Sequence, residues 1–154
     1  MPQAEAIAPL ELILNRTFKA PRERVFRAWT EAAQLDQWFA PAPDRTVKSS
    51  LDVRVGGAYR VEMRKPDGQV FGAFGVYREV RPPQRLVFTW SAIGGPEPVE
   101  DTLVTVEFFE AGDAGEKTQV TLTHQNFQSA EMRDRHQHGW TGCLDQLQRF
   151  TEDA

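Results

Sequence analysis

The chain has 154 residues, 40% hydrophobic and 26% charged, the composition of an ordinary globular protein with one core. Its formal net charge of −4 argues against a nucleic-acid partner and against binding to anionic membrane surfaces. The single cysteine, Cys143, excludes an internal disulfide and a multi-thiolate metal site, and no apolar run reaches the roughly 20 residues of a membrane helix. The first basic residue is Arg16, so the N-terminus lacks the pattern of a secretory signal and we expect a cytoplasmic protein.

The first predicted element is a strand from Leu10 to Phe18, because apolar residues recur there with a period of two. Residues 1–9 precede this pattern, and we interpret them as a flexible tail. No linker, repeat or change of composition follows, so residues 10–152 are predicted to form a single domain.

Two short helices are predicted after the first strand. Ala20-Pro21 opens one of them, because proline at the first helical position loses no needed donor. Thr30 is expected to cap the other. The residues that this second helix is expected to direct inward are Leu35, Trp38 and Phe39.

The middle of the chain is a succession of alternating segments joined by tight turns, such as Gly56-Gly57 and Pro66-Asp67-Gly68. Connections this short predict an antiparallel sheet of seven strands in all. We interpret Gly72 and Gly75, which lie within one strand, as bends that curve the sheet. The inner face of the strand Leu103–Phe109 stays open, since both of its faces carry apolar residues. The strands after the first are expected at 47–55, 59–63, 70–80, 86–90, 103–109 and 120–124.

The stretch from Ser129 to Thr151 changes to a helical period. Gly139 and Gly142 lie inside it, and each destabilises a helix by about 1 kcal/mol relative to alanine. Such a cost is tolerated where another segment approaches the backbone closely. The predicted fold is therefore α+β: a curved seven-stranded antiparallel sheet, two short helices after the first strand, and a long C-terminal helix with a cavity beneath it. The apolar stripe of that helix is Met132, His136, Trp140, Cys143, Leu147 and Phe150.

Several motifs carry a family resemblance over roughly residues 10–151. They are P-x-x-x-V-F-x-A-W-T from Pro21, L-x-x-W-F-x-P from Leu35, G-x-x-x-E-V-x-P-P-x-R-L-V-F-T-W from Gly75, and H-x-x-G-W-x-x-x-L-x-x-L from His136. The chain resembles the bacterial homologues of the activator of the heat-shock-protein-90 ATPase, within the START/polyketide-cyclase (SRPBCC, birch-pollen-allergen-like) superfamily. The resemblance implies a helix-grip fold with an internal pocket for apolar or amphipathic small molecules, and it does not imply ATPase activation. One departure is His124-Gln125-Asn126-Phe127, where the family often has H-E-G-F.

Aromatic residues are the main candidates for a pocket lining, because they bury much area yet leave irregular voids. The alternative is that they fill a dry core. The pocket mouth is expected where the longest loop, Ile93–Asp101, meets the start of the last helix. The candidate ligand-binding residues are Trp38, Tyr59, Val61, Met63, Phe88, Trp90, His124, His136 and Trp140.

Two histidines are candidates for chemistry. His124 is in phase with the core-facing residues of its strand, and His136 lies on the helical stripe. Facing one cavity, they would form a proton-transfer or ligand-binding pair. Otherwise each is a histidine whose hydrogen bonds are satisfied in the core. His138 lies on another side of the helix, so no metal site is expected.

Three functions are compatible with the sequence. The first is a protein that binds a small apolar ligand, with no cofactor, no metal and no assigned catalytic residue. The second is a polyketide-cyclase-like or hydratase-like enzyme in which His124, Tyr59 or His136 does acid–base work. The third is a chaperone-associated interaction module, which would require a contiguous exposed apolar patch. A homodimer is left open by the sequence.

Overall fold

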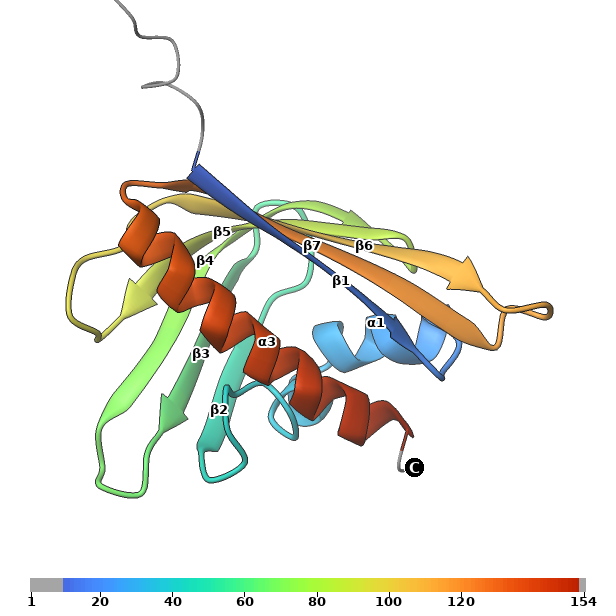
Figure 1. The fold of residues 1–154 in the computed structure, drawn as a ribbon, viewed down its shortest axis with the longest axis horizontal. Helices are drawn as coiled ribbons and strands as arrows, with labels where there is room; N and C mark the ends of the chain where they lie inside the picture. The colour runs from blue at the N-terminus through green and yellow to red at the C-terminus, as the bar shows by residue number, and fades with distance from the viewer. Residues whose placement is uncertain (1–9, 153–154) are drawn as a thin grey trace, which may run out of the picture.

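The computed structural model describes residues 10–152, so the expected N-terminal tail, residues 1–9, lies outside the described residues. One strand, two helices, six strands and a long helix follow one another along the chain, and Figure 1 shows how they are arranged in space. No helix within 10–152 is long and apolar enough to cross a membrane. The elements are β1 (Leu10–Phe18), α1 (Arg22–Thr30), α2 (Ala32–Leu35), β2 (Thr46–Leu51), β3 (Ala58–Arg64), β4 (Val70–Arg81), β5 (Arg85–Ile93), β6 (Thr102–Ala111), β7 (Lys117–Phe127) and α3 (Ala130–Glu152).

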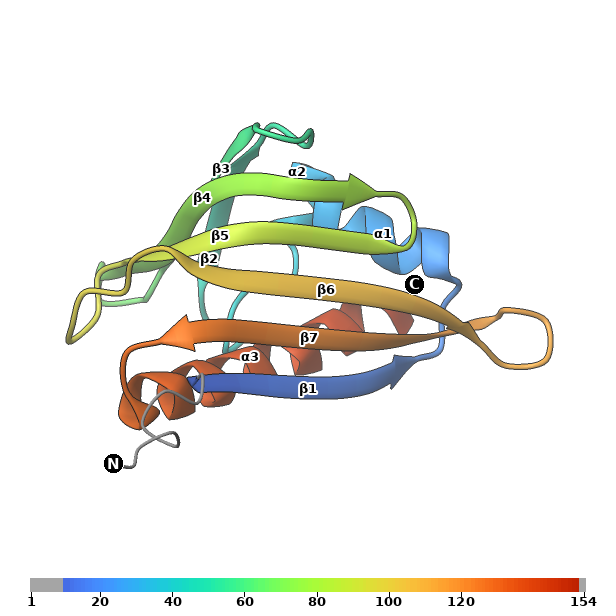
Figure 2. The same cartoon turned by 90° about the horizontal axis from the view of Figure 1, so that it is seen from above.

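The strands form one antiparallel sheet in the order β1-β7-β6-β5-β4-β3-β2, which confirms the predicted α+β fold (Figure 2). The glycines of β4 let neighbouring strands approach closely. A Cβ at Gly72 would lie 2.0 Å from the carbonyl oxygen of Val61, and one at Gly75 would lie 2.1 Å from that of Thr89. The pairing of β4 with β5 also shifts register between Tyr77 and Glu79, so the sheet bends along β4, as its glycines predicted.

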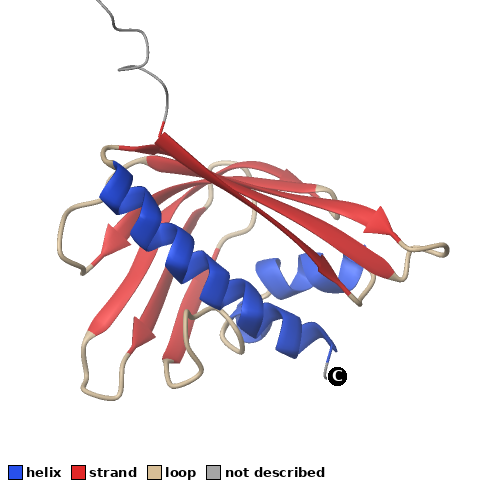
Figure 3. Cartoon of the chain, viewed as in Figure 1, coloured by secondary structure: helices blue, strands red, loops and turns tan. Residues whose placement is uncertain are grey.

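Helix α3 crosses the concave face of the sheet (Figure 3). Its start is fixed by Ser129, whose hydroxyl oxygen accepts a 3.1 Å hydrogen bond from the backbone N–H of Met132. Arg16 of β1 pairs with Asp145 at 2.6 Å, an additional tie between sheet and helix. The predicted helical stripe is confirmed, with His136 and Phe150 half-buried along it. The fully buried residues of α3 are Met132, Trp140, Cys143, Leu144, Leu147 and Thr151.

Helices α1 and α2 close one end of the space between α3 and the sheet with aromatic side chains. The ring of Phe26 meets that of Phe108 edge-on at 5.2 Å, and Trp29 meets Trp38 edge-on at 4.9 Å. The indole N–H of Trp38 donates a 2.9 Å hydrogen bond to the carbonyl oxygen of Ala28, which ties the segment after α2 to α1.

The expectation that Thr30 caps the second helix is wrong. Its hydroxyl donates instead to the carbonyl oxygen of Phe26, inside α1, and α2 begins after Glu31 without a side-chain cap. Trp38 and Phe39 lie beyond the end of α2, although both are buried as expected. The hydroxyl of Thr30 has an acceptor one turn back in its own helix, so it does not reach the next one.

The structure determines where the second strand ends and which residues of β6 face inward. The second strand ends at Leu51 rather than continuing to Val55, and the Val55 side chain is 68% exposed. The phase of β6 is set by its even positions, of which Val104 and Val106 are fully buried. Glu107 therefore faces outward, where its carboxylate pairs with Arg85 at 2.7 Å.

Candidate functional site

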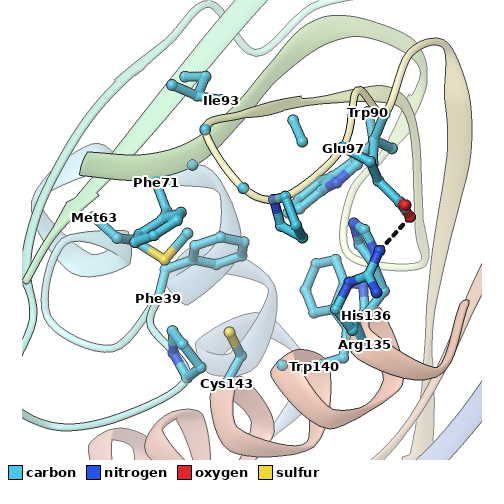
Figure 4. A pocket seen from close by; sticks show the side chains of 18 residues that line it. Phe39, Met63, Phe71, Trp90, Ile93, Glu97, Arg135, His136, Trp140 and Cys143 are labelled. Atoms are coloured by element: carbon cyan, nitrogen blue, oxygen red, sulfur yellow. Dashed lines mark hydrogen bonds and ion pairs between the residues drawn. The ribbon is translucent and has the colours of Figure 1, made fainter. Parts of the chain in front are cut away.

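A pocket of about 260 Å³ opens between α3, β3, β4 and the loop between β5 and β6 (Figure 4). Met63 of β3, Phe71 of β4 and Trp90 of β5 line its sheet side, and Trp140 of α3, whose ring centroid lies 5.0 Å from that of Trp90, lines its helix side. The loop from Gly94 to Val99 forms its rim. It therefore opens at the end of the sheet where the sequence placed the mouth.

An ion pair lies at this rim. Arg135 of α3 donates to the carboxylate of Glu97 in the β5–β6 loop, as the dashed line in Figure 4 marks. Both side chains are partly exposed. The pair joins the loop to the helix and leaves the rim without net charge.

The predicted lining residues are divided among three places. Met63, Trp90, His136 and Trp140 line the pocket. Tyr59, Val61 and Phe88 line a second cavity of about 30 Å³, which shares Trp90 and Phe39 with the pocket. Trp38 and His124 line neither one and are enclosed in the core.

Tyr59 has no free hydroxyl to offer a ligand. Its O–H donates a 2.5 Å hydrogen bond to the carbonyl oxygen of Thr89. Burial, with a smaller contribution from Tyr77, raises the pKa of Tyr59 well above its ordinary value. The phenol is thus neutral and its proton already has an acceptor.

His124 is sealed in the core with both ring nitrogens in use. The indole N–H of Trp140 donates to its Nδ1 at 3.0 Å, so Nδ1 is the acceptor and Nε2 carries the proton. Nε2 lies 2.8 Å from the hydroxyl of Thr102, which itself donates to the carbonyl oxygen of Trp90 at 2.7 Å. Burial, and next the proximity of His136, lowers the pKa of His124 well below its ordinary value. The ring is neutral and holds Trp140 against the sheet.

His136 differs because one of its nitrogens remains free. Its Nδ1 lies 2.9 Å from the carbonyl oxygen of Met132, which can only accept, so Nδ1 carries the proton. Nε2 makes no hydrogen bond to any of residues 10–152, and the ring borders the pocket (Figure 4). Burial lowers the pKa of His136, against an opposing effect of the Met132 carbonyl, so the ring is mostly neutral at pH 7.

Some lining residues were missed by sequence reasoning. Phe39 was expected to be buried but was not assigned to the pocket, and Phe71 lay on a strand whose inner face was not assigned. The Glu97–Arg135 pair had no sequence signal, because 38 positions separate its partners. Cys143, expected in the core, also borders the pocket. Burial raises the pKa of this thiol to about 12, so it is not a nucleophile.

The two glycines of α3 have different surroundings. A Cβ at Gly142 would lie 2.3 Å from the carbonyl oxygen of Pro41, which confirms the close approach expected there. A Cβ at Gly139 would meet nothing within 4 Å, and Gly139 borders the pocket. The expectation of close approach is therefore wrong for Gly139, which faces open space.

The departure from the family's H-E-G-F motif lies at the end of β7. Gln125 pairs with Glu11 and Leu103 and, next to the inward-facing His124, points to the outer face of the sheet. A carboxylate there would lie outside the pocket. Asn126 has φ of 76°, a left-handed conformation that glycine adopts freely and that asparagine tolerates better than most residues.

The metal-ligating residue types in residues 10–152 are not clustered. No group of three or more histidine, cysteine or acidic residues there is arranged to hold a metal ion. The exposed large hydrophobic residues of that range lie on different strands or loops. They are Ile13, Val55, Phe74 and Phe109.

Comparison with known proteins agrees with this architecture. An AHSA1 protein from Silicibacter pomeroyi has a TM-score of 0.77 and 27% identity, covering 90% of this chain and 95% of that chain. An AHSA1-like protein from Aeromonas hydrophila has a TM-score of 0.77 and 26% identity, covering 94% and 93%. A protein from Chromobacterium violaceum has a TM-score of 0.76 and 26% identity, covering 94% and 99%.

No curated protein matches the sequence. The family model described as "Activator of Hsp90 ATPase homolog 1-like protein" matches residues 19–152, nearly the whole chain. The match covers both short helices, the strands from β2 to β7 and α3. The chain therefore belongs to the Activator of Hsp90 ATPase homolog 1-like family of the SRPBCC superfamily.

Proposed function

We propose that this protein binds a small apolar or amphipathic molecule in the pocket between α3 and the β5–β6 loop. The observation that carries the proposal is the pocket of about 260 Å³, lined mainly by aromatic and aliphatic side chains and open at one rim. Removing apolar ligand surface from water there contributes about 25 cal/mol per Å².

The size of the pocket favours a compact ligand. Pockets for drug-sized molecules usually have volumes of about 300–1,000 Å³, and this one lies just below that range. One or two fused rings fit such a volume better than a long acyl chain. The indoles of Trp90 and Trp140, whose ring centroids lie 5.0 Å apart, would both contact the faces or edges of those rings.

The acid–base alternative depends on one residue. Tyr59 and His124 have their polar atoms occupied by protein partners, whereas Nε2 of His136 is free at the pocket wall. An enzyme built on this pocket would therefore use His136. The interaction-module alternative gains no support from the singly placed exposed hydrophobic residues of the described chain.

Filling the pocket tests the proposal directly. Gly139→Leu places an isobutyl group in open space, so we expect binding of naphthalene, followed by tryptophan fluorescence, to weaken at least tenfold. His138→Leu, an exposed substitution one residue away, is the matched control and should bind like the wild type. Equal naphthalene affinity in all three proteins, or no binding to the wild type, would contradict the proposal. Native mass spectrometry of protein purified from its own host would then identify the ligand.

A further inference from the structure

The chemical character of the pocket follows from one histidine tautomer. A backbone carbonyl oxygen has no proton to give, so the 2.9 Å contact with Met132 requires the proton of neutral His136 to be on Nδ1. Nε2 then presents only a lone pair. The helix itself therefore fixes the side chain as a hydrogen-bond acceptor at the pocket wall.

The other polar groups around this acceptor are already engaged or enclosed. The indole N–H of Trp140 donates to His124, and the guanidinium of Arg135 is paired with Glu97. The indole nitrogen of Trp90 has no hydrogen-bond partner in residues 10–152, but it is buried away from the open space. His136 thus offers a side-chain acceptor without a protein partner on a largely apolar wall, whereas the second carboxylate oxygen of Glu97 lies at the rim.

We propose that the pocket selects neutral apolar ligands that bear a hydroxyl group, a phenol or an alcohol, and that this hydroxyl donates its hydrogen bond to Nε2 of His136. This inference rests on the proposed function and specifies its ligand class. A ligand of the same skeleton without the O–H leaves Nε2 desolvated and unpaired, which costs binding free energy.

A carboxylate suits this wall less well than a hydroxyl. Its oxygens carry lone pairs and no proton, so they face the lone pair of Nε2 without forming a bond. The cation at the rim, Arg135, would have to leave Glu97 to compensate, and Glu97 would then stand unpaired beside a second anion. The arrangement therefore disfavours anionic ligands.

Three probes that differ in one substituent test the inference: 2-naphthol, 2-methoxynaphthalene and 2-naphthoate, titrated calorimetrically at pH 7.5. We expect wild-type protein to bind 2-naphthol about tenfold more tightly than the methyl ether, the effect of one hydrogen bond, and to bind the carboxylate most weakly. Equal affinity for the alcohol and the ether overturns the inference and leaves the proposed function standing. Tightest binding of the carboxylate also overturns it, whereas no binding of any probe overturns both.

A variant pair assigns the preference to His136. His136→Phe removes the acceptor, so the alcohol and the ether should bind alike, while binding of the ether persists. His138→Phe makes the same substitution at an exposed site of α3 and should keep the tenfold preference. A preference retained in His136→Phe overturns the assignment. If that variant does not fold, the wild-type comparison still decides whether the pocket prefers the hydroxyl.

Discussion

The two ends of the space between α3 and the sheet differ in how they are covered. At one end, α1 contributes Phe26 and Trp29, whose rings pack against Phe108, and α2 contributes the buried Leu35. At the other, the β5–β6 loop covers the sheet, and a pocket of about 260 Å³ remains. The same sheet and the same helix thus enclose a nearly filled core, with a cavity of about 30 Å³, and an open pocket.

The difference comes from the covering segments. A helix with one apolar face delivers several large side chains to the core in each pair of turns. The loop delivers Gly94 and Gly95, which have no side chains, and the small apolar side chains of Pro96 and Val99, while Glu97 turns toward Arg135 at the rim. Protein interiors are filled by interdigitating side chains, so a void remains where too little side-chain volume is supplied. The small side chains of the β5–β6 loop therefore account for the pocket at this end.

Trp140 lies where the two ends meet, so its removal should have the largest effect. Its ring stacks on that of Trp29, with the centroids 6.1 Å apart, and it also lines the pocket. We expect Trp140→Ala to lower the free energy of unfolding by about 3–5 kcal/mol, as large aromatic truncations do. A urea titration measures this loss. A loss below about 1 kcal/mol would show that α3 does not pack on the sheet as described.

Gly142 marks a close contact of α3 beside the pocket, because the neighbouring Pro41 also lines the pocket. Its Cα approaches the backbone of Pro41 so closely that an added methyl group must displace one of the two segments. We expect Gly142→Ala to destabilise the protein by about 1–3 kcal/mol, despite the better helix propensity of alanine. Thermal or chemical unfolding of the variant measures the change. Unchanged or increased stability would mean that α3 and the Pro41 segment do not meet this closely.

Much of this architecture was predictable from local patterns. Alternation from Leu10 and the helical stripe from Met132 to Phe150 report which face each element buries, and burial determines the packing. The patterns did not predict where an element ends. The alternation runs on to Val55, although the strand ends at Leu51, and the hydroxyl of Thr30 bonds within α1 instead of capping α2. Local sequence does not distinguish such cases.

The candidate site was less predictable than the fold. Inward-facing residues were identified, but a single sequence does not reveal whether an inward residue meets a neighbour or a void, so Trp38 was grouped with Trp90. The periodicity of the strand and that of the helix direct His124 and His136 inward alike, and the centroids of their rings lie 5.2 Å apart. Their difference comes from Thr102 and Trp140, two partners that only the fold brings to His124.

The sealed histidine should make stability depend on pH. Burial lowers the pKa of His124 in the folded state, so below about pH 6.5 the unfolded chain binds more protons than the folded one. Its stabilising contribution is therefore complete above that pH and is lost as the pH falls, by at most about 1.4 kcal/mol per pH unit for one proton. Urea titrations between pH 7.5 and 5.5 measure the slope.

His124→Gln removes the titrating group and should flatten this slope, although it also lowers stability at pH 7.5. His138→Gln, at an exposed position, should leave the slope of the wild type. If His124→Gln kept the full slope, His136 would have to be its source, since burial lowers the pKa of that ring as well.

The smallest expected effect distinguishes open space from close packing along the same helix. Gly139 and Gly142 are separated by less than one helical turn, yet a methyl group at Gly139 meets no atom within 4 Å. Gly139→Ala should therefore raise the free energy of unfolding by about 0.5–1 kcal/mol, because alanine restricts the unfolded chain and favours the helix. The sign is opposite to that expected for Gly142→Ala, and the same urea titration measures both. A destabilised Gly139→Ala would show that the loop or another segment closes onto α3 in solution, since a methyl group in an open pocket has nothing to displace.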